Sequence, residues 1–274
     1  MTAKISLIDT FCKYYQNPVY ENIKNETWGR ESINIASALT MHELNRFCDW
    51  LSVKPGMTIL DVCCGVGETT KYIAEKTKSK AFGIDINADV INAAQNLTKE
   101  NKLDLTFIKA DVRNTLPFDS AYFDAILFLE GVIYFSEPER VSILKECSRI
   151  LKPNGKLIYT DPCVVSSILS DNELASRSVF GGYYFSPVGA QENLFEQSGF
   201  KLIKAEDITE INCEAVHKRW WASRKKNKTA LKKLELADEF ECINDFVENC
   251  SHLYDGEKNQ RKLSQYAFYL EKLS

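Results

Sequence analysis

The sequence predicts an α/β fold built on a doubly wound, largely parallel β-sheet. From residue 59 onward, short apolar runs typical of buried strands alternate with longer segments of helical periodicity. Such an alternation requires strands that are covered by helices on both faces. Several of the apolar runs also end at small or acidic residues, and this places polar groups along one edge of the predicted sheet.

The length and composition suit one α/β domain with a sizeable insertion or cap. The chain has 274 residues, enough to bury a large core. It carries 34 Lys+Arg against 38 Asp+Glu, a net charge of −4 that gives no overall attraction to nucleic acid or to an anionic membrane. No stretch has the apolar length of a signal peptide core or of a membrane helix. We therefore expect a cytoplasmic protein that neither binds nucleic acid nor inserts into a membrane.

The cysteines and the basic residues give no further site. The 9 cysteines are scattered without C-x-x-C spacing, so we expect neither a disulfide framework nor a metal site. The basic run at residues 224–228 is interpreted as a solvated helix face.

Residues 1–54 are expected to form an N-terminal helical lid. Apolar positions recur at helical spacing over residues 5–15, and a second amphipathic helix is predicted over residues 41–51. Between them, residues 20–37 are too polar for a core strand and too aromatic for a disordered linker. We expect this segment to fold over a bound ligand.

The remaining elements are predicted in chain order from periodicity and turn residues. We expect residues 152–155 to form a turn and Asp161-Pro162 to break the strand that follows. The boundaries that result are a core at residues 55–211 and 264–274, and a helical cap at residues 212–263. Strands are predicted at residues 59–62, 81–86, 105–110, 123–128, 156–160, 199–205 and 266–270, and core helices at residues 68–76, 88–98, 138–150 and 188–198.

The segment at residues 58–70 organises the rest of the chain. Gly65 and Gly67 follow the first strand, and without a Cβ their backbone can take positive φ and lie against a ligand. Glycine turns after strands are common, so this segment alone leaves a plain turn as the alternative. The second strand, however, ends at Asp85, about 20 residues further on, where nucleotide-binding folds place an acid on the ribose hydroxyls. Asp111 follows the third strand, so we expect a nucleotide-like ligand at this edge.

This pattern resembles the class I S-adenosylmethionine-dependent methyltransferases over roughly residues 58–161. Their first motif, D-x-G-x-G-x-G, is matched by Asp61, Gly65 and Gly67, with Cys63 where the first glycine usually stands. The resemblance implies an enzyme with S-adenosyl-L-methionine as cofactor. It also implies a Rossmann-like, doubly wound seven-stranded sheet whose last strand is antiparallel.

The resemblance also implies roles for individual residues. Gly65 and Gly67 would contact the methionine half of the cofactor, and Asp61 would hold its ammonium group. Asp85 would accept both ribose hydroxyls, and Asp111 the adenine amino group. The complete set of implied cofactor-binding residues is Asp61, Gly65, Gly67, Asp85, Ile86, Asp111, Val112, Glu130 and Trp28.

The flanking segments resemble the small-molecule branch of the family, which includes phosphoethanolamine, tocopherol and sarcosine methyltransferases. The phosphobase enzymes pair an N-terminal tyrosine with a histidine just after the fourth strand, and here Tyr134 stands at that position. No arginine lies within residues 180–185 to bind a phosphate. Both departures argue against a phosphobase acceptor.

Methyl transfer is an in-line displacement, so the protein must mainly hold the acceptor close and aligned. A hydroxyl acceptor also needs a base, and His217, beside Trp220 and Trp221, is the histidine placed to serve; a packed histidine in the cap is the alternative. The candidate catalytic residues are Tyr15, Tyr134 and His217. The sequence thus predicts methylation of a small molecule in a covered aromatic pocket. Two alternatives stay open, a protein or peptide methyltransferase and a non-catalytic scaffold that binds the cofactor.

Overall fold

The computed structural model describes residues 13–14, 17–29, 39–100, 102–166, 169–177, 184–210, 214–255 and 261–273. The chain divides into two compact units. The first comprises Met1–Met41, Pro162–Pro187 and Asp207–Gln265, and the second comprises His42–Asp161, Val188–Glu206 and Tyr266–Ser274. Most of the helix predicted over residues 5–15 lies outside the described residues.

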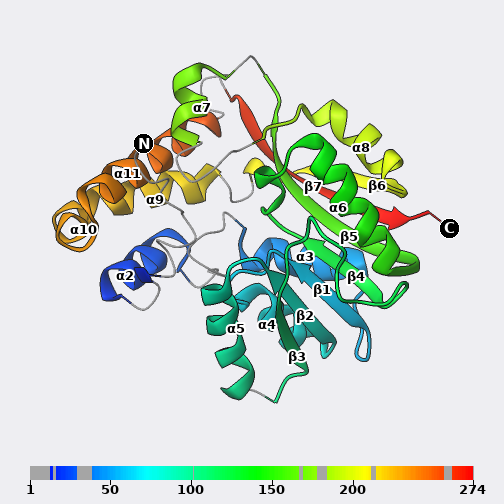
Figure 1. Ribbon diagram of the computed structural model, residues 1–274. Helices are drawn as coiled ribbons and strands as arrows, with labels where there is room; N and C mark the ends of the chain where they lie inside the picture. The colour runs from blue at the N-terminus through cyan, green and yellow to red at the C-terminus, as the bar shows by residue number, and fades with distance from the viewer. Residues whose placement is uncertain are drawn as a thin grey trace. The chain divides into compact units, whose positions relative to one another are not determined.

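A seven-stranded sheet has the order β3-β2-β1-β4-β5-β7-β6 (Figure 1). Neighbouring strands from β3 to β5 are parallel, and the last strand is antiparallel, which confirms the predicted fold class. The central strand β1 buries Ile59, Leu60 and Val62 completely. The strands are β1 Thr58–Val62, β2 Lys80–Asp85, β3 Leu105–Lys109, β4 Phe123–Phe128, β5 Leu151–Val164, β6 Phe200–Asp207 and β7 Leu263–Lys272.

The helices of the second unit follow the predicted pattern. Each predicted core helix is present, and the bounds differ from the expected ones by only a few residues, as is usual for helix ends. Helix α6 begins with a capping box in which the Ser136 amide donates to the Glu139 carboxylate at 2.8 Å. The helices are α3 Met41–Leu51, α4 Glu68–Thr77, α5 Ala88–Glu100, α6 Glu137–Ile150 and α8 Gln191–Gln197, with short 3₁₀ helices η2 Val132–Tyr134 and η4 Val188–Ala190.

Strand β5 differs from the prediction at both of its ends. Phe123 of β4 pairs with Leu151, and Ala125 pairs with Lys156, so the predicted turn is a bulge within one longer strand. Asn154 in this bulge has a φ of 60°. The expected break at Asp161-Pro162 is wrong, because β5 continues to Val164. Pairing with β4 ends at Tyr159, so the missing N–H of Pro162 removes no hydrogen bond to that strand.

Among the described residues, the first unit contains the helices predicted for the cap and two helices that were not predicted, α2 and α7. Helix α2, Pro18–Thr27, begins at Asn17, whose side chain accepts a hydrogen bond from the Val19 amide. Pro18 suits the first turn, where its missing N–H has no partner to lose. The other helices are α7 Asp171–Arg177, α9 Glu214–Lys226, α10 Lys228–Leu234 and α11 Ala237–Leu253.

Arg224 corrects the interpretation of the basic run as a solvated face. Its side chain is 1 % exposed and forms an ion pair with Glu235, whose side chain is fully buried. Two hydrogen bonds of 3.0 and 2.7 Å join the guanidinium to the Glu235 carboxylate. The Tyr20 hydroxyl of α2 donates to the same carboxylate at 2.5 Å. This buried network joins α2 to helices that lie about 200 residues later in the sequence.

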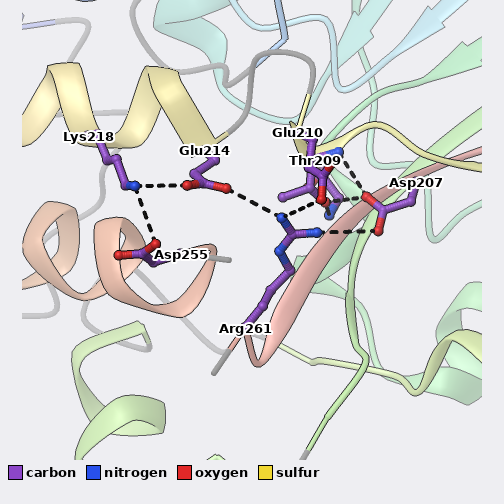
Figure 2. A network of polar contacts seen from close by, with 8 residues as sticks. Asp207, Thr209, Glu210, Glu214, Lys218, Asp255 and Arg261 are labelled. Atoms are coloured by element: carbon purple, nitrogen blue, oxygen red, sulfur yellow. Dashed lines mark hydrogen bonds and ion pairs between the residues drawn. The ribbon is translucent and has the colours of Figure 1, made fainter. Parts of the chain in front are cut away.

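A second network joins the two ends of the long helical segment of the first unit (Figure 2). Arg261, just before β7, lies 3.8 Å from Asp207 and 3.2 Å from Glu210, both of which precede α9. It also lies 3.3 Å from Glu214, the first residue of α9. The residues labelled in this network are Asp207, Thr209, Glu210, Glu214, Lys218, Asp255 and Arg261. Among the described residues, no helix is both long enough and apolar enough to span a membrane.

Candidate functional site

The predicted cofactor residues that follow β1, β2, β3 and β4 lie at one edge of the sheet in the second unit. Val62 pairs with Ile84 on one side and with Phe128 on the other, and Asp85 pairs with Lys109, so these strands end nearly level. The strand order reverses direction between β1 and β4. In doubly wound sheets, ligands bind outside the carboxyl ends of the strands at such a switch point.

The loop after β1 has the backbone conformation that the sequence predicts. Gly65 and Gly67 have φ values of 54° and 82°, in the left-handed region that glycine adopts without strain. A Cβ on Gly67 would lie 2.6 Å from the Phe107 ring, so packing also requires a glycine there. A Cβ on Gly65 would meet nothing within 4 Å. The backbone at Gly65 is therefore accessible to a ligand.

Asp61 is a buried acid on the central strand. Its side chain accepts a hydrogen bond of 2.6 Å from the Thr70 hydroxyl, and the residue is 3 % exposed. Burial raises its pKa to about 7, and the nearby Asp85 adds to the rise, while the Thr70 hydrogen bond opposes it. A buried carboxylate of this kind is stabilised when a cation binds beside it.

Asp85 connects the glycine loop to helix α5. Its Oδ2 accepts from the Gly65 amide at 3.1 Å, and its Oδ1 accepts from the Asn87 amide at 2.9 Å. Burial raises the pKa of Asp85, although these backbone hydrogen bonds favour the charged form. Ile86, the next residue, is 53 % exposed and presents an apolar side chain beside the acid.

Asp111 lies two residues beyond β3 and forms an ion pair with Arg113. The guanidinium approaches the carboxylate at 2.8 and 2.9 Å, and the Arg113 amide also donates to it at 3.0 Å. These hydrogen bonds lower the pKa of Asp111, so the acid is charged at neutral pH. Val112 between them is buried.

Glu130 and Tyr134 follow β4 in the same unit. Glu130 has a φ of 56°, and its amide donates to the Thr160 hydroxyl at 2.9 Å. Tyr134 ends the short helix η2 and is partly exposed.

Trp28 and His217 belong to the first unit. Trp28 follows α2, is buried, and contacts Trp220 with ring centroids 5.6 Å apart. His217 is a buried residue of α9 that stacks on Tyr254 with centroids 4.7 Å apart. Tyr15 lies outside the described residues. The structure thus groups the acids and glycines, and it places Trp28 and His217 in the other unit.

Some residues of this edge were not found from the sequence. Thr70, Arg113 and Thr160 each form a hydrogen bond with a predicted residue, and their partners depend on three-dimensional proximity or on turn geometry. Asn87 had a detectable signal, since its side chain accepts from the Asp89 amide at the start of α5, as a helix N-cap does. In the described ranges, no three His, Cys, Asp or Glu side chains are grouped to hold a metal ion.

Comparison with known proteins gives a family match that includes this edge. Residues 59–155, which include β1 to β4 and the loops after them, match a family described as a methyltransferase domain. Over these residues the chain is similar to the class I S-adenosylmethionine-dependent methyltransferases. Enzymes of this family use S-adenosylmethionine as the methyl donor.

Individual methyltransferases resemble the chain over part of their length. Methyltransferase GfsG of Streptomyces halstedii is 30 % identical over 168 residues, which cover 58 % of this chain and 58 % of the relative. Phosphoethanolamine N-methyltransferase 1 of Zea mays is 30 % identical over 164 residues, which cover 60 % of this chain and 32 % of the relative. The match therefore covers between a third and three fifths of the length of these curated relatives.

Comparison with solved structures shows a similarity that covers nearly the whole chain. The crystal structure of a putative sarcosine dimethylglycine methyltransferase from Galdieria sulphuraria has a TM-score of 0.76. The match covers 95 % of this chain and 99 % of that one at 16 % identity. At this identity the likeness establishes a shared methyltransferase fold.

Proposed function

We propose that the protein transfers a methyl group from S-adenosyl-L-methionine to a small-molecule acceptor. The observation that best supports this function is the hydrogen bond between the Gly65 amide and Asp85, which joins a glycine loop to a strand-end acid. Similarity to the methyltransferase family supports this class of reaction, and the geometry of this edge suits the donor that the family uses.

The residues at this edge fit that donor. Gly65 leaves space where a side chain would otherwise stand, so its backbone can approach a ligand closely. Asp61 and Asp85 are buried carboxylates, which match an ammonium group and a pair of ribose hydroxyls. The bound donor would supply an activated methyl group on a positively charged sulfur.

Each of these site residues would then have a physical role in binding the donor. Asp61 would hold the ammonium group, and the positive charge would keep Asp61 ionised despite its burial. Asp85 would bind the ribose hydroxyls through lone pairs that its two backbone hydrogen bonds leave available. Asp111 and the Val112 amide would form hydrogen bonds with the edge of the adenine ring. The exposed Ile86 would pack against the face of that ring.

Two residues that follow β4 in the second unit are proposed to extend the site, Glu130 as the wall near the sulfonium and Tyr134 as a contact of the acceptor. In the first unit, Trp28 is proposed as an aromatic contact of the cofactor. Tyr15 and His217 are proposed to orient the acceptor or take its proton. A covered aromatic pocket would hold a small molecule in line with the methyl group.

The relatives support a small acceptor without identifying it. The maize relative is named for phosphoethanolamine and the Galdieria protein for sarcosine and dimethylglycine, all of which are small amines. The described cysteines are all free thiols, which suits the reducing cytoplasm that we propose as the location.

The test is transfer of labelled methyl groups from S-adenosylmethionine into an extract of the source organism. The small-molecule and protein fractions are analysed separately by mass spectrometry, and Asp85→Ala is the matched inactive variant. Label in a small molecule supports the proposal. Label confined to the protein fraction favours a peptide methyltransferase. Tight cofactor binding without any label favours a non-catalytic scaffold.

A further inference from the structure

Gly131 packs against the side chain of Cys63 and, at a slightly longer distance, against the ring of Phe128. The φ of Gly131 is −83°, a value that any residue adopts, so its backbone does not require a glycine. A Cβ added to Gly131 would lie 2.8 Å from the Cβ of Cys63 and 3.0 Å from its Sγ. Contacts that short are not tolerated in a packed interior. The side chain of Cys63 occupies the space that a side chain at position 131 would need.

At Cys63, by contrast, the backbone conformation favours glycine, yet the residue has a side chain. Its φ is 60°, in the left-handed region, where glycine is unstrained and a residue with a Cβ is not. The backbone at position 63 therefore favours glycine, yet the chain has a side chain there. At position 131 the backbone accepts any residue, yet the chain has none.

The contact lies where it can control the cofactor loop. Val62 and Phe128 are paired neighbours on β1 and β4, and Cys63 and Gly131 follow them at the switch point of the sheet. Cys63 begins the loop that leads to Gly65, whose amide binds Asp85. Burial, together with the charges of Asp85 and Asp61, raises the pKa of the Cys63 thiol, so the side chain is a neutral packing group.

We propose that Cys63 is a positioning residue for the methyl donor. Its side chain, seated in the space left by Gly131, holds the loop at residues 63–67 in the conformation that presents the Gly65 backbone to the donor. Gly131 is the partner that this side chain requires. The proposal rests on the proposed function, because it concerns the affinity of the same site for its cofactor.

Four variants and the wild type test the pair: Gly131→Ala, Cys63→Gly, the double variant with both changes, and Cys63→Ala combined with Gly131→Ala. Binding of S-adenosylhomocysteine is measured by calorimetry.

Gly131→Ala should weaken binding by about tenfold or more, the effect expected of overpacking beside a site. Cys63→Gly should weaken binding by about threefold, because the loop loses the contact that holds it. Adding Cys63→Gly to Gly131→Ala should recover most of the loss.

The Cys63→Ala combination is the matched control. Alanine at position 63 keeps the Cβ that would stand 2.8 Å from a Cβ at position 131, so it should not rescue Gly131→Ala. Urea unfolding without ligand gives the folded fraction of each variant, to which the dissociation constants are corrected. The KM for the donor should rise more than kcat falls, whereas a role in folding alone would leave the corrected affinities equal.

Three results would overturn the proposal: wild-type affinity in Gly131→Ala, equal rescue by Cys63→Ala and Cys63→Gly, or corrected affinities that do not differ. A wild-type protein that fails to bind S-adenosylhomocysteine would instead overturn the proposed function, and the positioning role with it. Wild-type binding without coupling between the two positions would overturn this inference alone.

Discussion

The Thr70 hydroxyl donates a hydrogen bond of 2.6 Å to Asp61 Oδ2, and both side chains are buried. This bond joins the first turn of α4 to the central strand β1. It gives a buried carboxylate a partner that the sequence motif does not include. The energetic consequences of burying Asp61 can be measured in several ways.

Replacing Thr70 by Val keeps the shape of the side chain and removes the donor. We expect the free energy of unfolding to fall by about 1–3 kcal/mol, because a buried acceptor loses its hydrogen bond. Urea denaturation at pH 7 measures the change. Thr70→Ser retains the hydroxyl and should lose less stability than the Val variant. Little loss in the Val variant, or a larger loss in the Ser variant, would show that the hydrogen bond is not the main contribution of this side chain.

Asp61 should also make the ligand-free protein less stable as the pH rises. Its pKa is about 7 in the folded protein and near 3.8 without burial, so the folded state binds the proton more tightly. The contribution of Asp61 is therefore fully present below about pH 4 and is lost as the pH rises through 7. At 1.36 kcal/mol per pH unit, the complete loss is about 4 kcal/mol.

The comparison with Asp61→Asn isolates this effect from the other acids, several of which have lowered pKa values and act in the opposite direction. The stability of the wild type minus that of the variant should fall between pH 4 and pH 7. A difference that stays constant over this range would show that Asp61 is ionised at acid pH in the folded protein.

Ligand binding should release a proton from Asp61 near neutral pH. Without ligand, the acid is partly protonated at pH 7, and an ammonium group beside it would favour the charged form. Calorimetry of S-adenosylhomocysteine binding in buffers of different ionisation enthalpy measures the protons released. We expect release at pH 6.5–7.5, and almost none at pH 9, where Asp61 is already ionised. Identical proton release at both pH values would place the ammonium group away from Asp61.

Arg224 should be far more important for stability than the adjacent basic residue. Replacing it by Met leaves the buried carboxylate of Glu235 without its cation, which costs about 3–5 kcal/mol. Lys225→Met, at an exposed position of the same helix, should change stability by less than about 0.5 kcal/mol. Thermal unfolding of the two variants gives the comparison. Similar stabilities would mean that the buried ion pair is easily replaced.

The sequence predicted the sheet and the residues that end its strands well, because both depend on local patterns. Buried strands are continuous apolar runs, and the residues that end them are adjacent in the sequence. The left-handed conformation of Gly65 and the position of Asp85 could therefore be predicted without contacts. The roles of the site residues in binding and catalysis stay predictions.

The failures share a physical cause, which is dependence on distant partners. Pro162 is tolerated in β5 because β4 has already ended, a fact about a neighbouring strand. The burial of Arg224 depends on Glu235 and on Tyr20, which lies on a helix far away in the sequence. In the sequence Gly131 is an ordinary turn glycine, and only the structure shows that a side chain there would collide with Cys63. Tertiary contacts decide such cases, and a single sequence does not display them.

The most direct measurement is the affinity of S-adenosylhomocysteine for the wild type, Asp85→Ala and Asp104→Ala by calorimetry. Asp104 is an exposed acid just before β3, at the opposite end of that strand from the site. We expect micromolar-class binding in the wild type and in Asp104→Ala, and a loss of most of the affinity in Asp85→Ala. Unchanged affinity in a folded Asp85→Ala protein would contradict the assignment of this sheet edge as the methyl donor site.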